Sequence, residues 1–142
     1  MKYLLIILCI FSSIEAIEYE KSKNVVIDKQ NKLIWQDNIE VTEYLETFIT
    51  AKVYCENIVL NGYIDWRVPT INEILNIIDV TKKNAINKNF KYVKPNFYST
   101  STTFKENSEL LWGVDFKSGM VVTTKKIDEN YIRCVRDIKW KK

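Results

Sequence analysis

The apolar positions of this 142-residue chain follow helical spacing in some segments and strand alternation in others, and one short stretch joins the two patterns. Gly62 fits the left-handed position that ends a helix, because glycine has no Cβ. Large and polar side chains alternate over residues 63–68, which predicts a short strand or an extended segment. Pro69 disfavours helix in the residue before it. Thr70 and Glu73 have the spacing of a capping box, so a new helix is expected to begin here.

Apolar residues that recur at spacings of three and four predict two helices. We expect the first helix to run from residue 48 to Gly62, with Thr47 as its N-cap and Cys55 turned towards the core. We expect the second helix to run from Ile71 to about Asp79, with one buried face.

Apolar runs bounded by turn signals predict the strands of an antiparallel sheet. The first hairpin joins residues 25–28 and 33–35 through a turn in which Asn31 is able to adopt a positive φ. The other strands are residues 97–103, a hairpin of residues 110–116 and 120–124, and a last strand over residues 131–136. The predicted fold class is therefore α+β, with two helices packed on antiparallel hairpins.

Residues 80–96 lack a sustained apolar face and are rich in lysine and asparagine. We interpret them as a long surface loop, which Phe90 and Tyr92 attach to the core. A loop of this length in a small domain is unusual and often carries function. Its lysines are Lys82, Lys83, Lys88, Lys91 and Lys94.

The first residues have the pattern of a secretory signal peptide: a charged start, a short apolar run and a small residue, Ala16, at the cleavage point. Lipidation of Cys9 is disfavoured, because Leu8 stands where a small residue is expected. The apolar run is too short to span a bilayer comfortably, so no transmembrane segment is expected after cleavage. We expect export to the periplasm or the cell exterior. The predicted parts are a signal peptide (1–16), a polar lead (17–23), one domain (24–138) and a basic tail (139–142).

Two cysteines, Cys55 and Cys134, remain after removal of the signal peptide. In an exported chain they most simply form one disulfide, and two buried free thiols are the alternative. The sequence contains no histidine, which excludes Ser-His-Asp and Cys-His catalysis and zinc sites with histidine ligands. The net charge of +3 is mildly basic and does not by itself indicate nucleic-acid binding.

Several short blocks occur in a defined order along the predicted domain. They are Val26-Ile27-Asp28 with Leu33-Ile34-Trp35-Gln36-Asp37, Ala51 with Tyr54-Cys55-Glu56-Asn57, Gly62-Tyr63-Ile64-Asp65-Trp66-Arg67-Val68-Pro69-Thr70 with Glu73-Ile74-Leu75, Tyr98-Ser99-Thr100-Ser101, Trp112 with Val114-Asp115-Phe116 and Gly119, and Arg133-Cys134-Val135-Arg136. In these blocks the chain resembles the Lcl C-terminal domain family, named for the carboxy-terminal domain of a Legionella collagen-like adhesin. The resemblance covers about residues 24–137.

The resemblance implies a C-type lectin-like fold, in which Cys55 on the first helix bonds Cys134 on the last strand and ties the chain ends together. It also implies that the long loop after the second helix is the variable, ligand-facing region. The adhesin domain of this family binds sulfated glycosaminoglycans. The chain departs from the family at Tyr98, where tryptophan is usual, and in its lysine-rich loop.

The most specific of these blocks are interpreted as scaffold. Trp66 is expected to be buried beside a structural ion pair of Asp65 and Arg67. Arg133 is expected to point outward from the last strand or to pair with Asp115. The whole structural set is Gly62, Asp65, Trp66, Arg67, Pro69, Trp112 and Arg133.

The residue types favour binding over catalysis. Calcium-dependent sugar binding needs clustered carboxylates. Lys94-Pro95-Asn96 resembles the loop motif of the calcium-dependent lectins but has a lysine where an acid would coordinate the ion. Asp115 offers only one carboxylate, so we expect no metal site and no cofactor. The related formylglycine-generating enzymes use a pair of active cysteines, whereas the only pair here is assigned to the disulfide. We therefore expect no enzyme activity.

The resulting hypothesis is an exported adhesin-type module that binds a sulfated or other anionic glycan, or another polyanion, through its loop. Two alternatives stay open: a loop that is only solvated, and a module that binds an envelope or host-surface protein. Strong salt dependence of binding would favour the polyanion, since exposed charges are screened. The candidate ligand-binding residues are Lys82, Lys83, Lys88, Lys91 and Lys94, with Tyr92, Phe97 and Tyr98 as stacking or packing surfaces.

Overall fold

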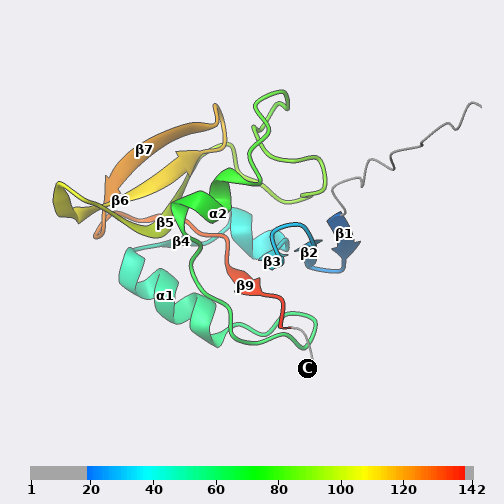
Figure 1. Cartoon of the computed structure of the whole chain (residues 1–142). Coiled ribbons are helices and arrows are strands. Elements are labelled where there is room, and N and C mark those ends of the chain that lie inside the picture. Colours follow the sequence, from blue (N-terminus) through cyan, green and yellow to red (C-terminus); the bar gives the residue numbers. More distant parts are fainter. Residues whose placement is uncertain (1–18, 140–142) are drawn as a thin grey trace, which may run out of the picture.

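Two sheets form the frame of the domain, and two short α-helices pack against them (Figure 1). The computed structural model describes residues 19–139. Its elements are β1 (Tyr19–Ser22), β2 (Val25–Asp28), β3 (Leu33–Gln36), the 3-10 helix η1 (Ile39–Thr42), β4 (Leu45–Glu46), α1 (Phe48–Asn57), α2 (Ile71–Leu75), β5 (Phe97–Phe104), β6 (Asn107–Asp115), β7 (Met120–Lys125), β8 (Asn130–Tyr131) and β9 (Val135–Asp137). The predicted signal peptide (1–16) and residues 140–142 of the predicted tail lie outside the described residues.

The strand pairing confirms the predicted α+β class. The first sheet has the order β1-β2-β3-β9 and is antiparallel throughout. The second has the order β4-β8-β5-β6-β7 and is antiparallel except between β5 and β8. The first sheet therefore contains strands from both the beginning and the end of the described chain, with β1 and β9 at its two borders.

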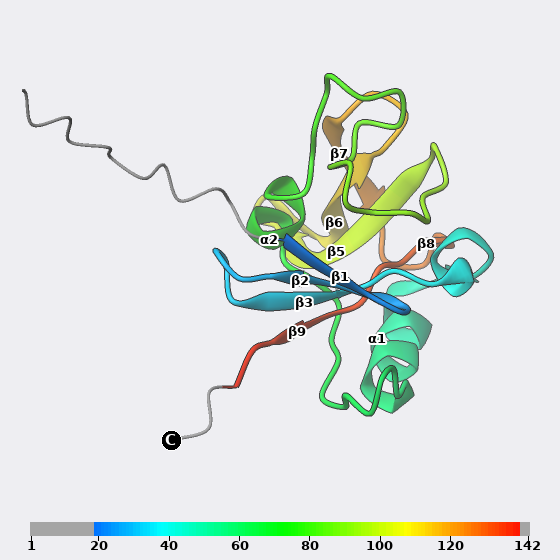
Figure 2. The same cartoon turned by 90° about the vertical axis from the view of Figure 1, so that its right-hand side faces the viewer.

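The strands β2 and β3 of the first sheet are buried on both of its faces. Side chains alternate between the faces of a strand, so Val26 and Trp35 join a core with α2 and the second sheet, whereas Val25 and Ile34 join a core with α1. Figure 2 shows this sheet between α1 and the strands β5, β6 and β7. Burial on two faces explains why β2 and β3 are nearly continuous apolar runs and do not alternate with polar residues.

A disulfide lies within the core that contains α1. Cys55 in α1 bonds Cys134, just before β9, with 5.6 Å between their Cα atoms, and this confirms the predicted pairing. Both cysteines are fully buried beside Ala51 and Trp66. The bond spans 79 residues of sequence and joins the first helix to the C-terminal strand.

The first helix is shorter than predicted, and Gly62 does not end it. The helix stops before Ile58, which has φ −70° and ψ 148°. Leu60 and Tyr63 then exchange two backbone hydrogen bonds, and Asn61 and Gly62 between them have φ of 51° and 76°. Two positive φ values in a two-residue connection are typical of a type I′ turn, for which Asn-Gly is a preferred pair. Gly62 is therefore needed for a hairpin turn and not for a helix stop.

A short strand or an extended segment was predicted for residues 63–68, and the structure shows an extended segment without a strand. Asp65 has φ 64°, which interrupts the alternation. Arg67 alone pairs with β9, through two backbone hydrogen bonds to Val135 of 2.8 and 2.9 Å. Trp66 is buried, as predicted.

The ion pair predicted between Asp65 and Arg67 is wrong, because each side chain has other partners. Arg67 donates from both terminal nitrogens to the Glu73 carboxylate, at 2.8 and 2.7 Å, and also contacts Asp137 at 2.9 Å. Asp65 is exposed and pairs with Lys139 at the surface. Arg67 therefore links the segment before α2 to both α2 and β9.

The second helix begins as predicted and ends earlier. The Glu73 N–H donates to the Thr70 hydroxyl at 3.3 Å, and the Thr70 N–H donates to the Glu73 carboxylate at 2.8 Å, so the capping box is confirmed. The helix ends at Leu75, because Ile78 pairs instead with Ile86 of the following loop. The end of α2 thus anchors the loop that follows it.

Three other elements differ from the predictions. The polar lead, residues 17–23, contains β1. In the β2–β3 turn the positive φ belongs to Lys32 and not to Asn31, whose backbone and side-chain N–H groups donate to the Asp28 carboxylate. The predicted last strand is two short strands, β8 and β9, which lie in different sheets with Cys134 between them. The last of these differences arises because β8 and β9 pair with strands that are distant in sequence.

The predicted hairpin after the long loop is confirmed as β6 and β7. Trp112 in β6 is half-buried and packs edge to face on Phe104, with 5.2 Å between ring centroids. Pro69 is buried, and its carbonyl accepts a 2.8 Å hydrogen bond from the Ser101 N–H of β5. The Trp112 contact lies within the second sheet, whereas Pro69 joins the segment before α2 to that sheet.

Replacing Cys55 and Cys134 together by alanine is expected to lower the free energy of unfolding by about 4 kcal/mol, because the cross-link closes a long loop in the unfolded chain. Urea denaturation of the oxidised protein and of the double variant measures the difference. Reduced wild-type protein should match the variant. Equal stability of the oxidised and reduced proteins would contradict this expectation.

Glu73→Gln tests the ion pair alone, since glutamine can keep the capping box. Burial acts to raise the pKa of Glu73, but hydrogen bonds from Arg67 and Thr70 outweigh it, so the pKa is lowered. A lowered folded-state pKa means that the stabilisation is complete above the ordinary value of about 4.3 and is lost as the pH falls through the folded value. We expect the variant to be less stable by about 1 kcal/mol at neutral pH. In urea titrations this difference should shrink in acid; a constant difference down to strongly acidic pH would argue against it.

Candidate ligand-binding site

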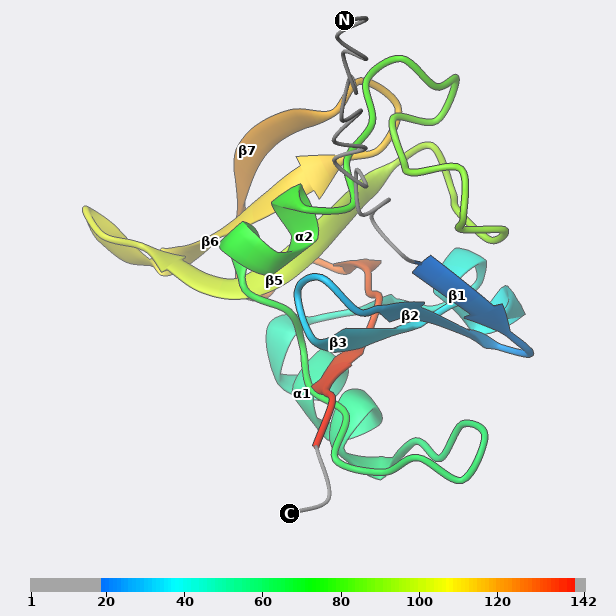
Figure 3. The ribbon, with the colours of Figure 1, turned by 45° about the vertical axis from the view of Figure 1, so that its right-hand side comes forward.

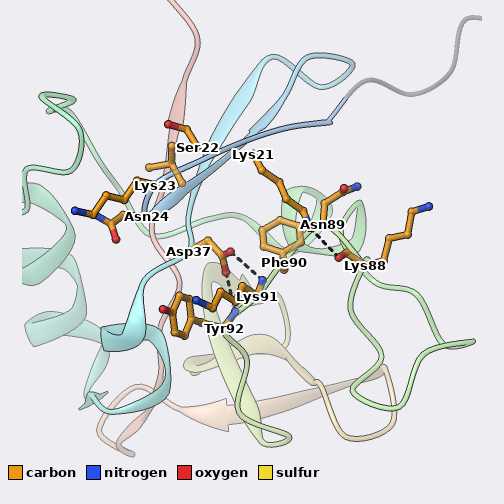
Figure 4. A pocket seen from close by; sticks show the side chains of 11 residues that line it. Lys21, Ser22, Lys23, Asn24, Asp37, Lys88, Asn89, Phe90, Lys91 and Tyr92 are labelled. Atoms are coloured by element: carbon orange, nitrogen blue, oxygen red, sulfur yellow. Dashed lines mark hydrogen bonds between the residues drawn. The ribbon is translucent and has the colours of Figure 1, made fainter.

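A pocket of about 520 Å³ lies between the β1–β2 turn and the long loop. Figure 3 shows the loop leaving α2 and approaching β1, and Figure 4 shows the pocket that these segments enclose. Two segments far apart in sequence therefore form one site. Its lining residues are Lys21, Ser22, Lys23, Asn24, Val25, Asp37, Lys88, Asn89, Phe90, Lys91 and Tyr92.

One wall of the pocket is the tight turn between β1 and β2. Ser22 pairs with Val25, so Lys23 and Asn24 form the two-residue connection. Asn24 adopts φ 69°, a left-handed conformation that asparagine tolerates better than most residues. Its carbonyl accepts a 2.8 Å hydrogen bond from the Asp37 N–H. The turn is thereby joined to the chain that follows β3.

The opposite wall is the loop, which apolar anchors hold against the core. Phe90 is buried and packs edge to face on Trp35, with 6.3 Å between ring centroids. Ala85 and Ile86 are also buried. The loop is therefore a surface segment with internal anchors, and the predicted attachment through Phe90 is confirmed. Lysines alternate with these anchors and stay exposed.

A buried ion pair at the base of the pocket determines the course of the loop. Arg133 is fully buried and Asp37 nearly so, with 3.2 Å between the Arg133 Nη1 and the Asp37 Oδ1. The two oxygens of Asp37 accept hydrogen bonds from the backbone N–H groups of Lys91 and Tyr92, at 2.9 and 3.1 Å. Arg133 also donates to the backbone carbonyls of Gln36 and Tyr92. The loop backbone is thus bound from both sides by one ion pair.

This arrangement corrects the prediction for Arg133. The side chain neither points outward nor pairs with Asp115. It is buried under the loop, where it pairs with Asp37. Its guanidinium also lies 4.9 Å from the Phe90 ring centroid, a cation–π contact. Asp115 instead stabilises the β6–β7 turn, where it accepts a 2.8 Å hydrogen bond from the Lys117 N–H.

The charge of the pocket is strongly positive. Lys21, Lys23, Lys88 and Lys91 contribute four exposed ammonium groups. Asp37 is the only acidic lining residue, and Arg133 compensates its charge. An anion in the pocket would therefore meet several cations and no free carboxylate among the lining side chains.

Tyr92 provides the aromatic part of the site. Its side chain is half-buried, and the Lys91 Nζ lies 4.8 Å from its ring centroid. Lys21 reaches across the pocket to the Lys88 carbonyl, with 3.5 Å between donor and acceptor. In Figure 4 the Lys91 and Tyr92 side chains lie together on one side of Asp37. A ligand with both a charged group and a flat apolar face would fit this combination.

Of the candidates from the sequence, the structure brings Lys88, Lys91 and Tyr92 into the pocket. Lys82, Lys83 and Lys94 are exposed but do not line it. They belong to the same loop, so sequence proximity alone grouped them with the site. Their place in a binding surface stays a prediction.

The two aromatic candidates after the loop belong to the scaffold. Tyr98 is fully buried, and its hydroxyl donates to the Val41 carbonyl at 2.6 Å, so its prediction as a ligand-facing residue is wrong. Burial also raises the pKa of this hydroxyl. Phe97 does not line the pocket and packs closely over Gly113, where a Cβ would clash with its ring. Both side chains hold β5 in place.

Three charged residues of the site were not predicted from the sequence. Lys21 and Lys23 lie in the polar lead, which was predicted to lie outside the domain, and no apolar pattern marked that segment as a strand. Asp37 was named only as a member of one of the sequence blocks. Its position directly after a buried strand was a usable signal, because an acidic residue there needs a buried partner.

A second pocket of about 410 Å³ lies beside α1 and carries less charge. Lys52 and Glu56 at its rim form a loose ion pair, and Arg67 is already engaged by Glu73. Its charges are therefore balanced by neighbours. The other lining residues are Phe48, Val68, Thr70 and Ser101.

Residues 19–139 contain no group of three or more His, Cys, Asp and Glu side chains that could hold a metal ion. In the same stretch, no helix has the length and apolar character needed to cross a membrane.

The fold and the pocket define a small disulfide-linked α+β domain with a basic, ligand-sized pocket. The family model described as the Lcl C-terminal domain matches residues 24–136, so the chain belongs to this family. The resemblance inferred from the sequence blocks is thereby confirmed. No curated protein matches the chain. Membership of an adhesin-related family and the disulfide together indicate an exported protein.

Asp37→Asn tests whether the ion pair holds the loop. Asparagine can still accept one hydrogen bond but leaves the buried Arg133 charge uncompensated, so we expect a loss of about 3 kcal/mol in the free energy of unfolding. Hydrogen exchange at the Lys91 and Tyr92 amides should accelerate together. Asp65→Asn is the matched control, because it removes only an exposed ion pair and should leave both measurements unchanged. Unaltered exchange at residues 91 and 92 in Asp37→Asn would refute the assignment.

Proposed function

We propose that this protein is an exported, non-catalytic binding module whose basic pocket recognises an anionic glycan or another polyanion. The observation that carries the proposal is the convergence of Lys21, Lys23, Lys88 and Lys91 around one pocket. Two of these lysines come from the β1–β2 hairpin and two from the loop after α2. Cations from distant segments that meet at one place support a binding role better than a run of lysines in sequence.

The energetics of the pocket favour a charged ligand. Exposed ammonium groups interact weakly with single anions in water, but several of them around one concave surface add their fields. The volume of about 520 Å³ lies in the range of small-ligand pockets. One acidic group of a polymer would enter the pocket, and the rest of the polymer would extend away from it over the surface. The half-buried ring of Tyr92 offers a surface against which a sugar face can pack.

We further propose that the fold is C-type lectin-like. Three features support this assignment: strands from both ends of the domain pair in one sheet, a disulfide joins α1 to the C-terminal strand, and a long irregular loop separates α2 from β5. In such a fold the loop would be the ligand-facing region. The basic pocket uses this loop for one of its walls.

A protein ligand is the second candidate, and one observation favours it. Ile49 and Val53 lie one turn apart on α1 and expose 74% and 54% of their surface. Large apolar residues on one exposed helix face are typical of protein contacts. This candidate would place the module in the periplasm or at the cell surface, beside an envelope or host protein.

Heparin chromatography in a salt gradient tests the polyanion hypothesis. We expect the wild-type protein to elute well above physiological ionic strength. Replacing the pocket lysines by glutamine (Lys21, Lys23, Lys88 and Lys91) should remove most of the retention. The matched control removes the same number of charges outside the pocket, through glutamine at Lys82, Lys83, Lys94 and Lys117.

The two variants separate a site from a general charge effect. Retention that falls equally in both would indicate only non-specific attraction, which salt screens. Retention that falls more in the control would place the binding surface on the outer loop lysines. An unretained wild-type protein would overturn the polyanion hypothesis and leave the protein ligand as the candidate.

A further inference from the structure

The strand β7 has an outer edge with which no other strand of residues 19–139 pairs. It is the last strand of the second sheet and pairs only with β6. Figures 1 and 3 show it at the border of the sheet. Within residues 19–139 no strand pairs with its outer edge, so most of the N–H and C=O groups on that edge have no strand partner. At its end, the Lys125 N–H donates to the Asp128 carboxylate at 3.2 Å. Such an edge is a template for another strand.

The first three side chains of β7 are apolar, and exposed side chains occupy both faces of the strand. Met120, Val121 and Val122 expose 62%, 40% and 37% of their surface, and Thr123 is also exposed. Successive residues point to opposite faces, so neither face of this strand is packed against the core. Val80 of the neighbouring loop, 69% exposed, lies beside Gly119 at the beginning of the strand and extends the apolar surface.

The strand also lacks the features that normally protect an edge. Proteins block free edges with proline, with charges inside the strand or with bulges. The β7 sequence, Met-Val-Val-Thr-Thr-Lys, has no proline, and its single charge is at the last position, Lys125. Its pairing with β6 is regular over all six residues, Met120 to Lys125. An unprotected apolar edge in an exported protein calls for a partner.

We propose that β7 pairs antiparallel with β7 of a second copy of this chain, so that the two five-stranded sheets become continuous across a two-fold axis. Alternate residues of a strand direct their backbone groups to the same edge, so the axis must pass through a residue. An axis at Val122 places this residue opposite Val122 of the second copy, and Val121 opposite Thr123 of the second copy. This interface is isologous, as is usual for dimers.

Charge favours a second copy over an unrelated peptide. With the axis at Val122, Lys125 lies opposite Gly119, so no lysine faces another lysine. Lys117, just before the strand, approaches the end of the partner strand that carries Asp128 and Glu129. Inside the strand there is no charge that would select an acidic or a basic peptide. The edge is thus complementary to itself.

The paired edges are short, so the contact is expected to be weaker than a standard interface of about 800 Å² per partner. The dimer should therefore appear as protein concentration rises. It does not depend on the ligand of the basic pocket, because none of the pocket residues lies in β7. A dimer would present two pockets to one polymer and so increase its retention.

Sedimentation velocity across a concentration series tests the pairing, with protein purified from the periplasm of a bacterial host. We expect the wild-type mass to rise towards twice the monomer mass. Val122→Lys and Val122→Glu should each remain monomeric, because like charges would meet at the axis. An equal mixture of the two variants should recover the dimer. Ile49→Lys on α1 is the control and should behave as the wild type.

The outcomes decide between occupants of the edge. Wild-type protein that stays monomeric at the highest concentration would overturn self-pairing. A dimer that persists in Val122→Lys would place the interface elsewhere and equally overturn it. Failure of the mixture to dimerise, with both variants shown by circular dichroism to be folded, would reject the axis at Val122.

Discussion

The buried contact between Asp37 and Arg133 is the interaction on which the candidate site depends. An ion pair without water is favourable only when hydrogen bonds satisfy its remaining atoms. Here the loop backbone supplies most of those bonds, through the N–H groups of Lys91 and Tyr92 and the Tyr92 carbonyl, and the Gln36 carbonyl supplies another. Among the described residues the Arg133 Nε has no hydrogen-bond partner. The charge pair and the loop therefore require each other. A loop without regular structure thus has one defined course beside the β1–β2 turn.

The same region is joined to the disulfide through the chain itself. Arg133 directly precedes Cys134, and Gln36 directly precedes Asp37. The Gln36 N–H donates to the Cys134 carbonyl at 2.9 Å, and the Cys134 N–H donates to the side-chain oxygen of Gln36 at 3.0 Å. The disulfide to α1, the first sheet and the base of the pocket are consequently one connected unit. This explains how a domain with only two short α-helices can hold a precise surface site.

The two exposed regions use different physical means. The basic pocket depends on charges that stay hydrated until an anion arrives, and salt should weaken it. The β7 edge depends on backbone groups and apolar side chains, on which salt has little effect. Ionic strength therefore separates ligand binding from self-association in this protein. If both occur, each polymer chain would meet paired sites.

Local residue patterns determined the parts of this protein whose energetics are local. The capping box at Thr70, the Thr47 cap, the β6–β7 hairpin and the burial of Trp66 were predictable because neighbouring residues decide them. The tertiary structure decided the rest. Asn61 and Gly62 form a hairpin turn because Leu60 and Tyr63 pair. Lys21 and Lys91 line the same pocket because β1 pairs with β2 in the first sheet. The partner of Arg133 lies 96 residues away in sequence, and no local pattern reports which distant carboxylate a buried charge will meet.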